Sequence, residues 1–214
     1  MIKRKKICYE KPVLVIYNPN SGKKINLVPT ISARFETAKI KVEFKPTQKY
    51  LDPFNFAREI DFSQYSLLIV AGGDGTIHEV VNGMLMRDDK KLIPLAFIPN
   101  GSGDDFCSAI GVMSVDHALD YICKGEIIKC DTARILMDHE TEETLPEGIE
   151  RLNHLRYMMI NSGAALPPLV AFKAKAWKAC CGKTSYTIAT LIEAIKGNIV
   201  PDIFDVFLDG QKVT

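Results

Sequence analysis

The sequence predicts an α/β protein, in which an open parallel sheet with helices is followed by a second, β-rich part that is incomplete. Over about the first 125 of its 214 residues, short apolar runs alternate with segments of helical periodicity, as in a parallel sheet covered by helices. Glycine-rich turns follow three of these runs. Beyond Lys124 the alternation stops. We therefore expect an α/β domain over residues 1–125 and a partial second domain over residues 126–214.

Four apolar runs are the predicted strands of the first domain: residues 12–17, 40–44, 67–71 and 93–99. The third run, Leu-Leu-Ile-Val-Ala, is apolar throughout, as expected for a strand that is buried on both faces. Helices are predicted at about residues 27–38 and at residues 52–60. Asp52 and Pro53 mark the start of the second helix, with Asp52 as its N-cap.

Three of the predicted strands end in glycine-rich turns, at residues 18–22, 72–75 and 101–103. In open parallel sheets, ligands bind outside the carboxyl ends of the strands. The coincidence of three such turns is more informative than any one of them. It predicts that the turns converge on one shared ligand site.

Asp74 is a carboxylate in a turn where glycines usually make room for phosphate. Thr76 and Glu79 fit a capping box for the next helix, which leaves Asp74 without a capping role. A carboxylate about 4 Å from a phosphate costs roughly 4 kcal/mol at a surface-like dielectric, so something must offset the repulsion. Either Mg²⁺ lies between the charges, or Asp74 accepts the proton of a hydroxyl that attacks a γ-phosphate. A plain Asp-Gly turn is the structural alternative.

Composition excludes several classes of protein. The net charge of +1 and the lack of any RNP, zinc-knuckle or helix-turn-helix signature argue against a nucleic-acid partner. The six cysteines contain no C-x-x-C pair and suggest reduced thiols, and the scattered histidines suggest no metal site. His78 is expected to face solvent. Without an apolar signal region or a membrane-spanning run, we expect an intracellular protein, either cytoplasmic or peripheral to a membrane.

The second part mixes strand and helix signals. Strands are predicted at residues 126–138 and 155–163, an acidic loop at 139–150, helices at 173–178 and 185–197, and a hairpin at 202–214. The hairpin carries apolar side chains on both faces, so we expect another polypeptide, or more of the chain, to cover its edge. Residues 171–183 combine four lysines with Trp177 and the Cys180–Cys181 pair. This stretch suits a membrane interface with acylated cysteines, or equally an ordinary exposed helix.

Together, the motifs Asn-Pro-Asn-Ser-Gly, Gly-Gly-Asp-Gly-Thr-Ile-His-Glu-Val-Val-Asn-Gly and Pro-Asn-Gly-Ser-Gly-Asp-Asp-Phe resemble the diacylglycerol, sphingosine and ceramide kinase family of lipid kinases. The resemblance runs from about residue 13 to residue 130, with the order of the motifs intact. A lone Gly-Gly-Asp-Gly also occurs in NAD kinases and phosphofructokinases. The Gly-Ser-Gly turn looks more like the eukaryotic sphingosine and ceramide kinases than their bacterial relatives.

The resemblance implies a nucleotide-binding domain of the NAD kinase and diacylglycerol kinase type, with ATP and Mg²⁺ as cofactors. It implies that Asp74 is the general base, or a metal ligand, for phosphate transfer to a sphingoid base, ceramide or diacylglycerol at a membrane surface. The nucleotide-binding residues that it implies are Asn18, Ser21, Gly22, Thr47, Gly72, Gly73, Gly75, Thr76, Gly101, Ser102 and Asp104. Among them, Gly75 and Thr76 are expected to present helix N-terminal N–H groups to the phosphates.

Three departures from the family pattern leave an alternative open. Asp104 stands where the family usually has Asn, although Asp104 or Asp105 is also expected to cap the following helix. Pro167 and Pro168 stand where sphingosine kinases carry an Asp-containing turn, and family chains continue beyond residue 214. The alternative is a catalytically inactive, kinase-like subunit or binding module of a larger assembly. An NAD kinase is a third, weaker alternative.

Overall fold

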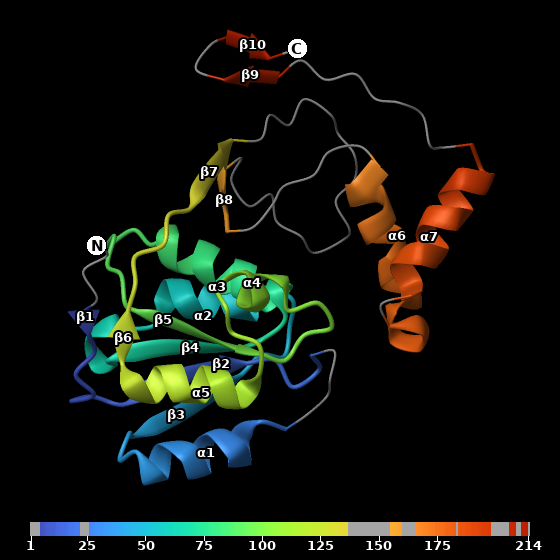
Figure 1. The fold of residues 1–214 in the computed structure, drawn as a ribbon. Helices are drawn as coiled ribbons and strands as arrows, with labels where there is room; N and C mark the ends of the chain where they lie inside the picture. Colours follow the sequence, from blue (N-terminus) through green and yellow to red (C-terminus); the bar gives the residue numbers. More distant parts are fainter. Residues whose placement is uncertain are drawn as a thin grey trace. The chain divides into compact units, whose positions relative to one another are not determined.

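A four-stranded parallel sheet with the strand order β3-β2-β4-β5 forms the centre of the α/β part (Figure 1). Its strands are β2 (Val13–Tyr17), β3 (Val42–Pro46), β4 (Leu67–Gly72) and β5 (Leu95–Pro99). The whole of β4 and most of β2 are buried, because helices cover both faces of the sheet. The predicted α/β class, with an open parallel sheet, is confirmed.

The computed structural model describes residues 5–21, 26–136, 155–159, 166–182, 184–197, 206–208 and 211–213. The chain divides into two units, Met1–Asn161 and Ser162–Thr214, and each is treated by itself. Among the described residues, no helix is both long and apolar enough to cross a bilayer. The domain boundary at residue 125 stays a prediction.

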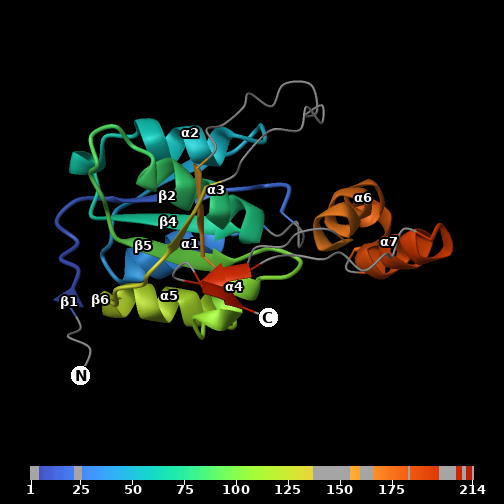
Figure 2. The ribbon, with the colours of Figure 1, turned by 90° about the horizontal axis from the view of Figure 1, so that it is seen from above.

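Helices lie on both faces of the sheet. On one face are α2 (Asp52–Glu59) and α3 (Asp74–Leu85), and on the other are α1 (Val28–Thr37) and α5 (Val115–Lys124) (Figures 1 and 2). The smaller elements of this unit are the 3₁₀ helix η1 (Phe62–Gln64), α4 (Asp105–Ala109), the β1 (Lys5–Lys6) and β6 (Glu126–Ile127) pair, and the β7 (Ala133–Leu136) and β8 (Leu155–Met158) pair. The strands and helices predicted over residues 12–99 exist, with small shifts at their ends. The single long strand predicted at residues 126–138 is instead two short strands, β6 and β7, which pair with β1 and β8 respectively.

Two other local predictions in this part were wrong. The second strand starts at Val42 rather than Ile40, because the N–H of Ile40 donates to Phe35 O and closes the end of α1. Asp52 is the first residue of α2 and not its N-cap. Its Oδ2 accepts hydrogen bonds from the backbone N–H groups of Gln48 (2.7 Å) and Lys49 (2.8 Å), so it orders the preceding turn instead.

The second unit contains the helices α6 (Leu166–Cys181) and α7 (Thr184–Ile195), which pack on each other, and the hairpin strands β9 (Val206–Leu208) and β10 (Gln211–Val213). The basic helix predicted at residues 173–178 is the middle of the longer α6. Pro167 and Pro168 fall in the first turn of α6, where no intrahelical N–H donor is needed. The predicted turn at Asp209 and Gly210 and the predicted acidic loop lie outside the described residues.

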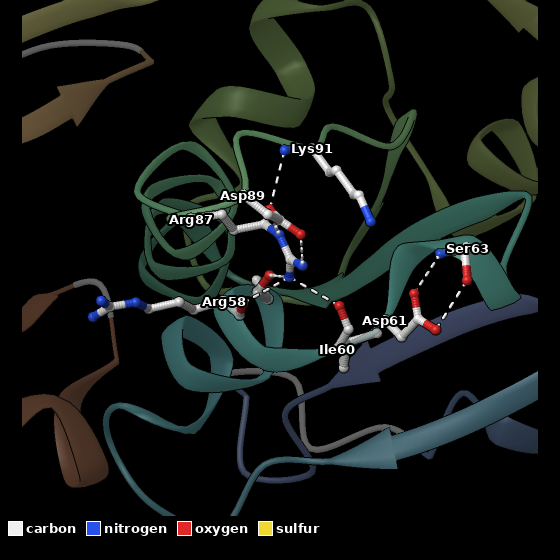
Figure 3. Close-up of polar contacts among 8 residues, drawn as sticks. Arg58, Ile60, Asp61, Ser63, Arg87, Asp89 and Lys91 are labelled. Atoms are coloured by element: carbon white, nitrogen blue, oxygen red, sulfur yellow. Dashed lines mark hydrogen bonds and ion pairs between the residues drawn. The ribbon is translucent and has the colours of Figure 1, made fainter.

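Helices α2 and α3 approach each other closely at Gly83, where a Cβ atom would overlap the carbonyl oxygen of Phe54. Just beyond α3, the buried guanidinium of Arg87 caps the end of α2 (Figure 3). Its Nη1 donates to the carbonyl oxygens of Ala57 (3.1 Å), Arg58 (2.6 Å) and Ile60 (2.9 Å). These carbonyls lie at the helix end, where backbone acceptors lack intrahelical partners. Arg87 therefore locks α2 to α3.

Asp89 completes this arrangement by accepting two hydrogen bonds, from Arg87 Nε (2.9 Å) and Arg87 Nη2 (2.8 Å). The guanidinium also lies 4.2 Å from the ring centroid of Phe62. Planar, bidentate pairing of this kind is available to arginine and not to lysine.

We predict that Arg87→Lys lowers the free energy of unfolding by about 2–3 kcal/mol, because an ammonium cannot bond to Asp89 and the three carbonyls together. Arg58→Lys is the matched control, since Arg58 is exposed and its ion pair with Asp88 spans 3.4 Å. It should cost about 0.5 kcal/mol or less. Equilibrium urea unfolding measures both, and equal losses would show that the Arg87 cap is not what holds α2 on α3.

Candidate functional site

The predicted loops meet at the carboxyl ends of the strands. Beyond β2, the N–H of Asn18 donates to Ala71 O (3.1 Å), and beyond β5, the N–H of Asn100 donates to Gly72 O (3.1 Å). Beyond β3, the N–H of Thr47 donates to Tyr17 O (2.9 Å). Because β3 and β4 lie on opposite sides of β2, the strand order reverses at this point, where open α/β sheets bind ligands.

The turns after β4 and β5 touch through their glycines. A Cβ atom on Gly73 would lie 3.1 Å from Gly101 Cα and 3.9 Å from Ser21 Oγ. A Cβ atom on Gly101 would lie 2.5 Å from Gly73 Cα and 2.7 Å from Asp104 Oδ1. These positions hold glycine because the two backbones pass too closely for any side chain. The contact brings three loops, from β2, β4 and β5, into one cluster.

Asp74 is the first residue of α3, and its carboxylate reaches across to another helix. Its Oδ1 accepts a hydrogen bond from the N–H of Phe106, in the first turn of α4 (2.9 Å). The carboxylate therefore caps α4 from outside that helix, and its charge also suits the N-terminus of α3. Asp74 is not the spare carboxylate that the sequence suggested.

The predicted capping box at Thr76 and Glu79 was wrong. The helix begins two residues before Thr76, which lies buried inside the first turn, where its side chain packs under Gly72. The N–H of Thr76 donates to Gly73 O (2.9 Å) and is therefore not offered to a ligand. Gly75 is exposed, with no atom within 4 Å of the place of a Cβ, so its backbone is open to a ligand.

Asp104 occupies the N-cap position of α4, but its side chain does not cap that helix, as had been expected of Asp104 or Asp105. Its backbone is left-handed (φ 58°), a conformation that Asp and Asn tolerate better than most residues. Its Oδ1 accepts from the N–H of Gly101 (2.6 Å), which closes the turn after β5. Asp104 is buried, and Asp74 supplies the acceptor that α4 needs.

The other predicted site residues line the same end of the sheet. Asn18 Oδ1 accepts from the N–H of Asn20 (2.9 Å) and shapes the first turn. Ser21 and Thr47 are buried, and Ser102 is half-buried. Gly22 lies outside the described residues. The roles of these residues toward a nucleotide stay predictions.

Two carboxylates border Gly103. A Cβ there would lie 3.1 Å from Asp74 Oδ2 and 3.4 Å from Asp105 Oδ2. Within the described ranges, no group of three or more His, Cys, Asp or Glu side chains could hold a metal ion by itself. Mg²⁺, however, typically takes one or two protein carboxylates and completes its shell with phosphate oxygens and water. Asp74 and Asp105 fit that requirement.

A second polar group, Glu79 and His78, lies farther along α3, and its burial was not predicted from the sequence. Glu79 is buried, and its Oε2 has no hydrogen-bond partner among the residues described. Burial raises the pKa of Glu79, although nearby Arg156 and a hydrogen bond from Tyr50 oppose that shift. His78 is half-buried rather than solvent-facing, and burial lowers its pKa, with Arg156 adding to the effect.

Comparison with known proteins places this chain in a family. The profile of the diacylglycerol kinase catalytic domain matches residues 12–135, more than half of the chain. The chain belongs to that family. A diacylglycerol kinase of Staphylococcus carnosus is 34% identical over 128 residues, which cover 58% of this chain and 41% of the relative. One of Bacillus subtilis is 33% identical over 129 residues, which cover 58% of this chain and 42% of the relative.

A diacylglycerol kinase structure from Bacillus anthracis matches with a TM-score of 0.48 and 29% identity, covering 58% of this chain and 46% of that one. The chain spans about two fifths of the length of the two curated relatives named above. The resemblance to lipid kinases found in the sequence motifs is confirmed at the level of the family.

We predict that Asp74→Asn and Asp74→Ala differ in stability. The amide oxygen of Asn can still accept from the Phe106 N–H, so Asp74→Asn should change the free energy of unfolding by less than about 1 kcal/mol. Asp74→Ala leaves that N–H without its acceptor and should cost about 1–2 kcal/mol. Asp116, exposed in the first turn of α5, provides a control pair. Thermal unfolding of the four variants tests this, and equal losses for both Asp74 variants would contradict the capping role.

Proposed function

We propose that this protein is an ATP-dependent lipid kinase that transfers the γ-phosphate of ATP to a lipid hydroxyl. The observation that carries the proposal is the Asp74 carboxylate at the meeting point of three glycine-rich loops. One oxygen, Oδ1, is held by the Phe106 N–H, and the other, Oδ2, borders the exposed Gly103. A carboxylate fixed in this way is oriented to act on a neighbouring hydroxyl.

The nucleotide phosphates belong at the Gly73–Gly101 contact. The N-terminus of α3 lies beside this contact and favours negative charge. The exposed Gly75 offers its backbone there, while Ser21 and Ser102 lie in the flanking turns. Mg²⁺ held by Asp105 and the phosphate oxygens would neutralise charge that builds up on the phosphates and would leave Asp74 available as the base.

Asp74 would accept the proton of the lipid hydroxyl as that hydroxyl attacks the γ-phosphate. The hydrogen bond from Phe106 holds the carboxylate in one orientation, so little reorganisation is needed for proton transfer. A diacylglycerol, ceramide or sphingoid base offers the required alcohol. The relatives in the comparison are named diacylglycerol kinases, which makes diacylglycerol the first acceptor to test.

The helices α6 and α7 support a membrane-borne acceptor. Phe172, Trp177, Leu191 and Ile195 are exposed large apolar side chains on these two helices. Residues 166–197 carry five lysines and one acidic residue, Glu193, which is buried and accepts a hydrogen bond from Lys173 (2.6 Å). Exposed apolar and aromatic groups with excess positive charge suit an anionic lipid surface.

One of the observations behind the alternative of a catalytically inactive module no longer supports it. Asp104, which stands where the family usually has Asn, is buried in its own turn and accepts a hydrogen bond from the Gly101 N–H. The remaining departure, at Pro167 and Pro168, concerns the acceptor side. Activity measurements therefore decide between the two functions.

We predict that Asp74→Asn lowers phosphate transfer from ATP to lipid by about 10²–10⁴-fold and leaves ATP affinity nearly unchanged. The assay follows labelled phosphate into diacylglycerol, ceramide and a sphingoid base in mixed micelles, with Asp116→Asn as the control. Nucleotide binding is titrated with and without Mg²⁺. Binding of Mg·ATP without transfer to any lipid by the unaltered chain would favour the inactive module. A large loss of Mg·ATP affinity in Asp74→Asn would instead make Asp74 chiefly a metal ligand.

We also predict that vesicles containing anionic lipid shift the fluorescence of Trp177, the single tryptophan of the chain, to shorter wavelength. Neutral vesicles should have little effect, and about 0.5 M salt should reverse most of the shift by screening the lysines. An unchanged spectrum with anionic vesicles would show that these helices do not enter the lipid interface.

A further inference from the structure

Asn82 joins α3 to the strand β8, which lies 75 residues away in the sequence. Its Oδ1 accepts from the N–H of Tyr157 in β8 (2.8 Å), and its Nδ2 donates to the carbonyl oxygen of the same residue (3.0 Å). Nδ2 also donates to His78 O, one turn back in α3 (2.9 Å). The side chain is fully buried, so these bonds are shielded from water.

The amide of Asn82 takes the place of a neighbouring strand. A side-chain amide has the same donor and acceptor as a peptide group, and here it pairs with both backbone groups of one residue. On its other side, β8 pairs with β7, where Tyr157 lies opposite Arg134. Only a residue with a donor and an acceptor at this reach can satisfy both groups of Tyr157. Each such group would be costly if left unbonded in a buried place.

The preceding residue of β8 strengthens the same attachment. Arg156 lies with its guanidinium 5.9 Å from the ring centroid of Phe54 and its Nη1 3.9 Å from Met86 Sδ. Met159, just after β8, packs against the core of the first unit. The segment is therefore attached at three positions, Arg156, Tyr157 and Met159, and the Asn82 bonds attach Tyr157 to α3.

Asn82 lies eight residues after Asp74 on the same helix, so both side chains project from one side of α3 with His78 between them. We infer that Asn82 is a positioning residue: it fixes β8 on α3 and so sets where the chain leaves the first unit, relative to Asp74. The inference rests on the proposed function, in which α6 and α7, which follow β8 in the chain, serve the lipid acceptor. Because Asn82 is fully buried, its role is to position β8 rather than to bind a ligand.

The test compares Asn82→Asp, Asn82→Ala and the unaltered full-length chain. Asp has the shape of Asn but, when ionised, sets a carboxylate against Tyr157 O and His78 O. Burial raises the pKa of such a carboxyl, and once protonated it can again donate to Tyr157 O. Asn82→Asp should therefore recover as the pH falls, while Asn82→Ala should not. Asn55→Asp, at an exposed position of α2, is the matched control for the added charge.

Hydrogen exchange at residues 155–159 is the first measurement. We expect faster exchange in Asn82→Asp at about pH 8, recovery toward the unaltered protein at about pH 5.5, and no recovery in Asn82→Ala. Exchange at β2 and β4 should stay unchanged. Exchange that rises equally throughout the first unit, or shows no pH-dependent recovery, would overturn the inference, because it would mark Asn82 as a general packing residue.

Kinetics provide the second measurement. At about pH 8, Asn82→Asp should raise the KM for lipid about tenfold, with a much smaller change in the KM for ATP, and the difference should shrink at lower pH. Equal changes in both KM values would count against positioning. If the unaltered chain phosphorylates no lipid, the proposed function fails, and the exchange data alone decide whether Asn82 fixes β8.

Discussion

The contact between Gly73 and Gly101 is the constraint on which the rest of the site depends. Two backbones pass at a distance that leaves no room for a β-carbon, and this closeness lets the turn after β4 meet the turn after β5. With the turns in contact, Asp74 at the start of α3 reaches the Phe106 N–H of α4, while Asp104 closes the turn after β5 by accepting from the Gly101 N–H. One steric condition thus places the Asp74 carboxylate and α4 at the ligand site.

Helix α3 connects the site to the other elements of the first unit. Asp74 accepts a hydrogen bond from α4, Glu79 accepts one from Tyr50, and Asn82 bonds to β8. At Gly83, the lack of a side chain lets α2 pack closely. Arg87, just past the end of α3, caps α2. The polar side chains along the helix serve different neighbours, which explains why a helix with so much buried surface still carries so many polar groups. These polar side chains bond to neighbouring elements of the fold rather than to solvent.

The layers of the fold and the place of the site could be predicted from sequence, because apolar runs and glycine turns are local signals. The details that failed depend on distant partners. Thr76 and Glu79 have capping-box spacing, but the helix begins earlier at Asp74, whose carboxylate finds its donor 32 residues away. Asn82 bonds to Tyr157, which lies 75 residues away, and no periodicity within α3 predicts such a pair. The order of the motifs gave the family, and tertiary packing decided what each polar residue touches.

The polar groups along α3 respond differently to acid. Hydrogen bonds from Arg87 lower the pKa of Asp89 to about 2, so this carboxylate stays ionised until the solution is strongly acidic. Its contribution to stability is complete above the ordinary pKa of Asp and disappears only as the pH falls through that low value. Glu79 behaves in the opposite way, since burial raises its pKa and it takes up a proton at a higher pH. As the pH falls, Glu79 in the middle of the helix, near Tyr50 and Arg156, therefore takes up a proton before Asp89 releases Arg87 at the far end.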